Sequence, residues 1–167
     1  MQALRPLLQL KPIDRLRRNH GLEHATIHVL AGRRRRSMAG YSDTRGFWLM
    51  GDLKTEEVEA GVSDALRRMK NGEPELAVHP GCGTNYVTAG AFGALAAFAA
   101  FFGARSLRDM LARLPLAMAL VTGALIFAQP IGLKLQAEVT TDGRVRDLEV
   151  ASVRRVRDGL HRVETRG

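Results

Sequence analysis

Two charge-free stretches constrain this chain more than any other feature. Residues 87–104 (VTAGAFGALAAFAAFFGA) and residues 115–133 (PLAMALVTGALIFAQPIGL) hold no charged side chain, and Gln129 is their only strongly polar residue. About 17–25 apolar residues cross the hydrocarbon core of a bilayer, so each stretch is long enough to span a membrane as a helix. The glycines and alanines of the first stretch would let two helices pack closely. We therefore predict a transmembrane helical hairpin over residues 87–133, with spans at 87–104 and 115–133.

The alternative is a hairpin of buried core helices in a soluble protein, because alanine-rich runs of this length also occur in cores. The rest of the chain argues against it, since it is rich in charged residues and offers little apolar surface to wrap two fully apolar helices. The sequence therefore favours the membrane.

The distribution of basic residues predicts how the hairpin is oriented. Fourteen lysines and arginines precede the first span and eight follow the second, whereas three lie in the connection at 105–114. A two-span hairpin puts both chain ends on one side, and the positive-inside rule makes that side the cytoplasm. We expect a multi-pass protein of the cell inner membrane with both termini cytoplasmic.

The net charge of +8 indicates an anionic partner. The arginine run Arg33–Arg36 is accompanied by no interleaved aromatic residues, so nucleic acid is disfavoured and a bilayer with anionic headgroups is the expected partner. A membrane-protein partner or a second copy of the chain is a further possibility. Cys82 is the only cysteine, which rules out an intramolecular disulfide.

For the remaining residues we predict an α+β fold: a small cytoplasmic head at 1–86, and a C-terminal β-hairpin with a basic tail at 134–167 that packs on the head. Periodicity and end signals predict, in order, a helix over 12–31, a short strand or hairpin near 46–51, a helix over 55–72, a strand over 75–78 and a loop over 79–85. Asp142-Gly143 is a strong hairpin signal, so we expect two strands around it. The last dozen residues are basic and are expected to fray.

The segment NHGLEHATIHVL carries three of the five histidines, at His20, His24 and His28, together with Glu23. Helical spacing places His20, Glu23 and His24 on the same stripe as aliphatic residues that should face the interior. Buried polar groups need partners, and histidines at i and i+4 can both point a nitrogen at one divalent ion. This spacing predicts a metal site, with zinc as the metal that neutral imidazole suits.

His20-Gly21-Leu22-Glu23-His24 resembles the H-x-x-E-H motif of inverted-motif zinc peptidases. The resemblance implies that His20 and His24 are zinc ligands and that Glu23 is the general base. The match covers five residues, so the fold and substrates of those peptidases do not carry over.

The loop HPGCGTN offers His79 or Cys82 as a third ligand, which would leave the fourth zinc position for water, whereas four protein ligands would make a closed structural site. Two interpretations without a metal stay open. One is a hydrogen-bonded cluster where the head joins the membrane. The other is Cys82 acting as a nucleophile with His79 as its base.

Over most of residues 14–150 the chain is similar to a family of small bacterial two-span membrane proteins of unknown function. The similarity lies in NHGLEHATIHVL, RGFWLMGDL, TEEVEAGV, LAVHPGCGTN and the two spans. It implies the architecture and no activity. Our functional hypothesis is a membrane-anchored metal-binding protein, in its enzymatic form a zinc-dependent, peptidase-like hydrolase. The alternative is a non-enzymatic membrane assembly or scaffold protein whose buried His/Glu cluster is structural.

Overall fold

The computed structural model describes residues 5–33 and 37–167, and the chain divides into two compact units. The first unit contains the chain up to His79 together with Ala137–Gly167, and the second contains Pro80–Gln136. Three members of the predicted arginine run, Arg34 to Arg36, lie outside the described residues.

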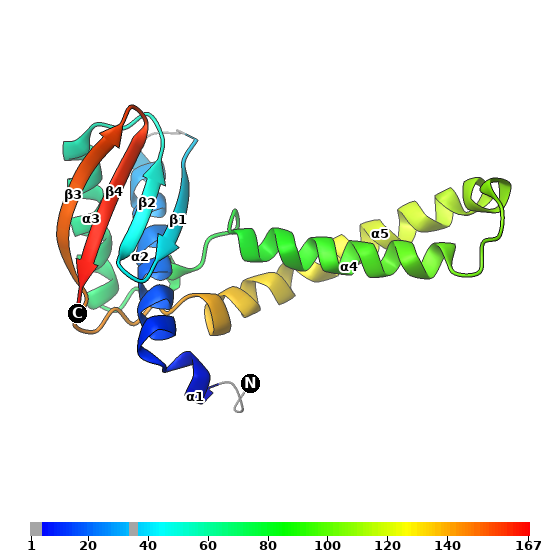
Figure 1. The fold of residues 1–167 in the computed structure, drawn as a ribbon, viewed down its shortest axis with the longest axis horizontal. Helices are drawn as coiled ribbons and strands as arrows, with labels where there is room; N and C mark the ends of the chain where they lie inside the picture. Colours follow the sequence, from blue (N-terminus) through cyan, green and yellow to red (C-terminus); the bar gives the residue numbers. More distant parts are fainter. Residues whose placement is uncertain (1–4, 34–36) are drawn as a thin grey trace. The chain divides into compact units, whose positions relative to one another are not determined.

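The first unit is built on a four-stranded antiparallel sheet whose strand order is β1-β2-β4-β3. Helices α2 and α3 cover one face of this sheet (Figure 1). A short helix α1 (Arg5–Leu8) precedes α2. The predicted α+β class is confirmed for this unit. The bounds are α2 Lys11–Arg33, β1 Ala39–Asp43, β2 Gly46–Met50, α3 Thr55–Lys70, β3 Glu149–Arg157 and β4 Leu160–Arg166.

The core lies between the sheet and the two helices. Alternation along the strands turns every second residue inward, and the helices add their apolar stripes. The apolar face of α3 is formed by Val58, Val62, Ala65 and Met69, which are buried. The apolar side chains with no exposed surface come from α2, β2, α3 and β4 and from the residue before β3: Leu22, Ala25, Phe47, Leu49, Val58, Val62, Ala65, Leu148 and Val163.

The prediction for the C-terminal hairpin is wrong in its position. The strands are not formed around Asp142-Gly143; the two-residue turn is Asp158-Gly159, with Gly159 at φ +69° and Arg157 paired with Leu160. Both dipeptides suit a tight turn. Only the second is flanked on both sides by strands that pair with each other, whereas Asp142 is held in ion pairs.

The expectation of a frayed C-terminus is also wrong. β4 lies inside the sheet and pairs with β2 on one side and β3 on the other. His161, Val163 and Thr165 are buried, and so is Arg162, whose charge is paired with Asp43 at 2.8 Å. A basic segment is therefore compatible with a central strand, because its charges alternate with core residues.

The predicted strand over 75–78 is a 3₁₀ helix instead, η2 (Pro74–Ala77). Proline has no N–H to donate to a strand ladder, but it suits the first turn of a helix. The predicted loop over 79–85 is shorter than expected, because α4 begins at Gly83.

The second unit contains α4 (Gly83–Phe101) and α5 (Leu107–Leu135). A π-helical turn, Gln136–Thr140, follows α5 and lies in the first unit from Ala137 on. Both helices are long and apolar enough to cross a membrane, judged by length and composition. Within their most apolar windows only 11% and 6% of the residues are buried. A pair of core helices in a soluble protein would bury most of these side chains, so this pair does not form a core within the described chain.

Candidate metal centre

The middle of α2 is buried on all sides. Glu23 and His24 are 4% and 3% exposed, while His20 and His28 are partly buried. Gly21 lets two other segments approach the helix, because a Cβ at this position would lie 2.6 Å from the carbonyl oxygen of Asp142 and 3.1 Å from Cβ of Ala77. The prediction that His20, Glu23 and His24 face the interior thus agrees with their burial.

Each of the three α2 histidines contacts a backbone carbonyl through one ring nitrogen. Nδ1 of His20 lies 3.0 Å from the oxygen of Thr140, and Nδ1 of His24 lies 2.7 Å from that of Ala77. Nε2 of His28 lies 2.9 Å from the oxygen of Val78. A carbonyl oxygen only accepts, so each of these nitrogens carries the proton, and in the neutral ring the other nitrogen carries the lone pair. Histidines that bind metals are held in this way.

The imidazoles form one group. Ring centroids are 4.4 Å apart for His20 and His24, 5.8 Å for His24 and His79, and 4.7 Å for His28 and His79. Ligand nitrogens of His20 and His24 lie within 4.8 Å of one another. Two nitrogens on one tetrahedral zinc are about 3.4 Å apart, given Zn–N bonds of about 2.0–2.1 Å, and the 4.8 Å limit includes this spacing. Two imidazoles at this spacing are donors that a divalent metal ion such as zinc can take.

His79 is held neutral by its surroundings. Burial lowers its pKa to about 4, and the neighbouring imidazoles of His28 and His24 act in the same direction. A neutral imidazole is the form that binds a metal ion. His79, which the sequence predicts as a possible third ligand, lies beside His24 and His28 of α2.

Glu23 lies against strand β1. Its Oε2 accepts a hydrogen bond from the hydroxyl of Ser42, and a Cβ on Gly40 would lie 2.2 Å from its Oε1. A side chain at position 40 would therefore displace the carboxylate from this place. Neither Ser42 nor Gly40 was singled out in the sequence, because nothing in the local pattern links them to a helix that lies before them in the chain. The role of Glu23 as general base stays a prediction.

Cys82 belongs to the second unit, where it precedes α4 and its thiol lies 3.6 Å from Oγ1 of Thr84. Only Pro80 and Gly81 separate it from His79, so the two Cα atoms are at most about 11 Å apart at about 3.6 Å per residue. Its assignment as a ligand or as a nucleophile stays a prediction.

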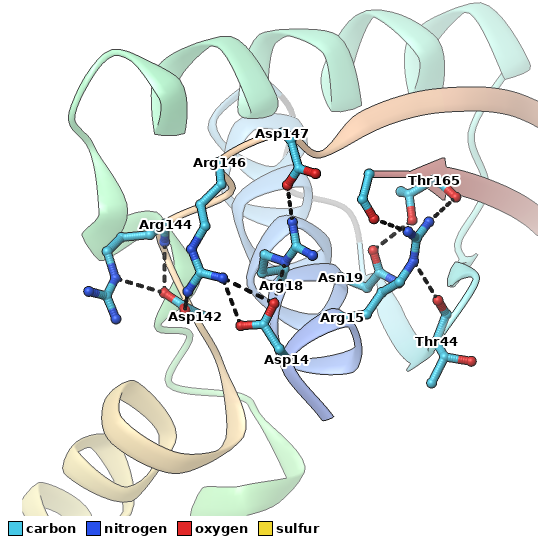
Figure 2. Close-up of polar contacts among 11 residues, drawn as sticks. Asp14, Arg15, Arg18, Asn19, Thr44, Asp142, Arg144, Arg146, Asp147 and Thr165 are labelled. Atoms are coloured by element: carbon cyan, nitrogen blue, oxygen red, sulfur yellow. Dashed lines mark hydrogen bonds and ion pairs between the residues drawn. The ribbon is translucent and has the colours of Figure 1, made fainter. Parts of the chain in front are cut away.

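Ion pairs connect the first turns of α2 to the segment after the π turn (Figure 2). Arg146 bridges Asp14 and Asp142 at 2.9 and 3.0 Å, and Arg18 contacts Asp14 and Asp147 at 3.0 and 2.7 Å. The hydrogen bond from Arg18 lowers the pKa of Asp147. Asp14, Arg18 and Asp142 are nearly buried, and a buried charge is tolerated when it is paired. This network fixes the segment that carries Thr140 and Asp142 beside α2.

A family model described as "Domain of unknown function (DUF6391)" matches residues 15–153. The chain belongs to this family. The DUF6391 match begins in α2 and ends in β3, so it includes the histidines of α2, the segment His79–Asn85 and both apolar helices.

An uncharacterized protein of Picosynechococcus sp. is 36% identical to this chain over 80 residues, which cover 42% of the chain and 39% of the relative. The matched part thus spans about two fifths of that relative's length. No solved structure matches the chain.

Proposed function

We propose that this member of the DUF6391 family is a membrane-anchored metal-binding protein in which the histidines of α2 hold zinc. The observation that carries the proposal is the set of three hydrogen bonds from His20, His24 and His28 to backbone carbonyls. These bonds select one tautomer for each ring and fix its orientation before any metal arrives, which lowers the cost of ordering the ligands.

The proposed ligands are His20 and His24, completed by Cys82 or His79. A thiolate is a strong zinc ligand, and Cys82 is tethered to His79 by two residues. His79 is neutral through its lowered pKa and its ring lies 5.8 Å from that of His24. Three protein ligands leave one position for water, which zinc would activate when bound.

Hydrolysis is the enzymatic form of this proposal. The order His20, Glu23, His24 supports it, together with the near-complete burial of Glu23 beside the two ligands. In that role Glu23 would take a proton from the attacking water, and the hydroxyl of Ser42 would hold the carboxylate in place. Without this reaction the protein is the non-enzymatic membrane component that the sequence also allows.

Elemental analysis of the full chain, purified in detergent without chelators, tests metal binding. We expect about one zinc per chain in wild type and in Glu23→Gln, and none in the His20→Ala/His24→Ala double variant. His161→Gln is the matched control, because this histidine lies outside the proposed site and contacts Thr55 of α3. It should bind zinc as wild type does. A wild-type protein that carries no zinc and takes up none from solution would refute the proposal.

Cobalt substitution separates the two candidate third ligands. A thiolate bound to Co²⁺ gives a charge-transfer band in the near ultraviolet, so the band disappears in Cys82→Ser if Cys82 is the ligand. If His79 is the ligand, wild type shows no such band and His79→Gln loses cobalt. Cleavage of a quenched fluorescent peptide mixture by wild type, but not by zinc-loaded Glu23→Gln, is the result expected of a hydrolase.

The exposed apolar surface of α4 and α5 supports membrane anchoring. We propose the inner membrane, with both termini cytoplasmic and with anionic headgroups as the partner of the basic residues that flank the spans. Terminal fusions to a reporter active only in the cytoplasm test the orientation: both fusions should be active, and a single active terminus would contradict the hairpin.

A further inference from the structure

The stretch that follows α5 is held on α2 by one side chain. Nε of Arg17 donates to the carbonyl of Val139 at 2.7 Å, and its Nη2 donates to the carbonyls of Glu138 and Thr141 at 3.1 and 2.9 Å. The backbone adds a further bond, from the N–H of Asp142 to the carbonyl of Arg17 at 3.0 Å. A single guanidinium thus binds three carbonyls within four residues.

Thr140 lies between Val139 and Thr141 in the chain. Its backbone carbonyl accepts a hydrogen bond from Nδ1 of His20. Arg17 and His20 are three residues apart on α2 and so lie on the same face of the helix. The guanidinium and the imidazole therefore contact one short piece of backbone from neighbouring positions. When this piece moves, the partner of His20 moves with it.

The piece of backbone at 138–141 lies partly beside open space. A cavity of about 920 Å³ borders it on one side, lined by Arg17, Glu138, Val139, Thr141 and Asp142 among others. Side chains next to an open cavity lack neighbours there and gain little from dispersion. Arg17 thus supplies three of the hydrogen bonds that hold residues 138–141 on α2.

We infer that Arg17 is a positioning residue for the metal centre, which sets the orientation of the His20 ring by holding residues 138–141 on α2. The inference rests on the proposed function, in that His20 is a zinc ligand. Residues 138–141 follow α5 directly in the chain. A change in their conformation would therefore alter the orientation of the His20 ring. A change in this π turn reaches the imidazole of His20 through a single hydrogen bond.

Arg15 is a matched control on the same helix. It too donates to three backbone carbonyls, those of Thr44, Thr165 and Gly167, and Figure 2 shows it beside Thr44 and Thr165. None of these carbonyls borders a histidine of the group. Arg15→Ala and Arg17→Ala therefore lose equivalent bonds, but only Arg17→Ala is predicted to disturb His20.

The test is cobalt affinity of the full chain in detergent for wild type, Arg17→Ala, Arg17→Lys and Arg15→Ala. Removal of a group that orients a ligand weakens metal binding about 10–100-fold, so we expect a loss of about tenfold or more in Arg17→Ala. Lysine restores part of this loss because its ammonium can donate to the same carbonyls. Arg15→Ala should bind cobalt as wild type does. Equal affinities in Arg17→Ala and Arg15→Ala would overturn the inference.

Nitrogen NMR of the histidine rings provides a readout that does not need metal. In wild type we expect His20 to carry its proton on Nδ1, and in Arg17→Ala we expect a mixture of tautomers for His20 with His24 unchanged. If wild type binds no metal, the proposed function fails, but this measurement still decides the role of Arg17. An unchanged His20 tautomer in Arg17→Ala would refute that role.

Discussion

Substitution of Gly21 by alanine would disturb both segments that hold the histidines. The added Cβ would lie 2.6 Å from the carbonyl oxygen of Asp142 and 3.1 Å from Cβ of Ala77. Asp142 cannot easily retreat, because its N–H donates to the carbonyl of Arg17 and its carboxylate is paired with Arg146. Ala77 accepts the proton of His24, and Thr140, two residues before Asp142, accepts that of His20.

The size of the effect follows from two opposing terms. Forcing a methyl group into a closed contact costs about 1–3 kcal/mol, because backbone atoms must shift. Alanine is favoured over glycine in a helix by about 1 kcal/mol. Gly21→Ala should therefore lower the free energy of unfolding by about 0–2 kcal/mol. It should also weaken zinc binding about tenfold or more, because the partners of His20 and His24 move together.

Gly32→Ala isolates the helix term, because this glycine also lies in α2 and no atom of the described residues lies within 4 Å of its added Cβ. The difference between the two variants should then be about 1–3 kcal/mol. Trp48 is the only tryptophan and lies in β2, so its fluorescence during urea titration in detergent reports the unfolding of the first unit. Equal urea midpoints and equal zinc affinities in the two variants would refute the argument from close approach at Gly21.

Three further predictions follow from the same structure. In metal-free protein the pKa of His79 is lowered to about 4 in the folded state, whereas it is about 6.5 in the unfolded chain. Between these two pH values the unfolded chain binds a proton at His79 and the folded chain does not. Stability should fall across that range, and His79→Gln should flatten the fall in urea midpoints; a wild-type profile that stays flat would contradict it. Gly159→Ala should cost about 1–2 kcal/mol, because φ of +69° is unfavourable for alanine; an unchanged urea midpoint would show that the turn relaxes. Leu125→Arg should prevent membrane insertion, because an arginine at the centre of a span raises the free energy of insertion by about 2.5–3.5 kcal/mol, whereas Leu107→Arg at the start of α5 should still insert. Carbonate extraction of both variants checks this. Full extraction of wild type would exclude insertion.

Part of this protein could be predicted from the sequence because the signals are local. The absence of charge over two long stretches identified the helices that are apolar enough to cross a membrane. Periodicity and end residues identified α2 and α3, and the i, i+4 spacing identified the histidines that group together. His79 was predicted from a glycine- and proline-bent loop, and the structure brings its ring to those of His24 and His28.

The remaining features depend on partners that are distant in sequence. The sequence contains two Asp-Gly dipeptides, and only the pairing of β4 with both β2 and β3 decided which one forms the turn. Ser42 reaches Glu23 from a strand that follows the helix in the chain. The tautomers of His20 and His24 are selected by carbonyls 120 and 53 residues away. Such hydrogen bonds form only when folding brings the segments together, so no local pattern of residues could predict them.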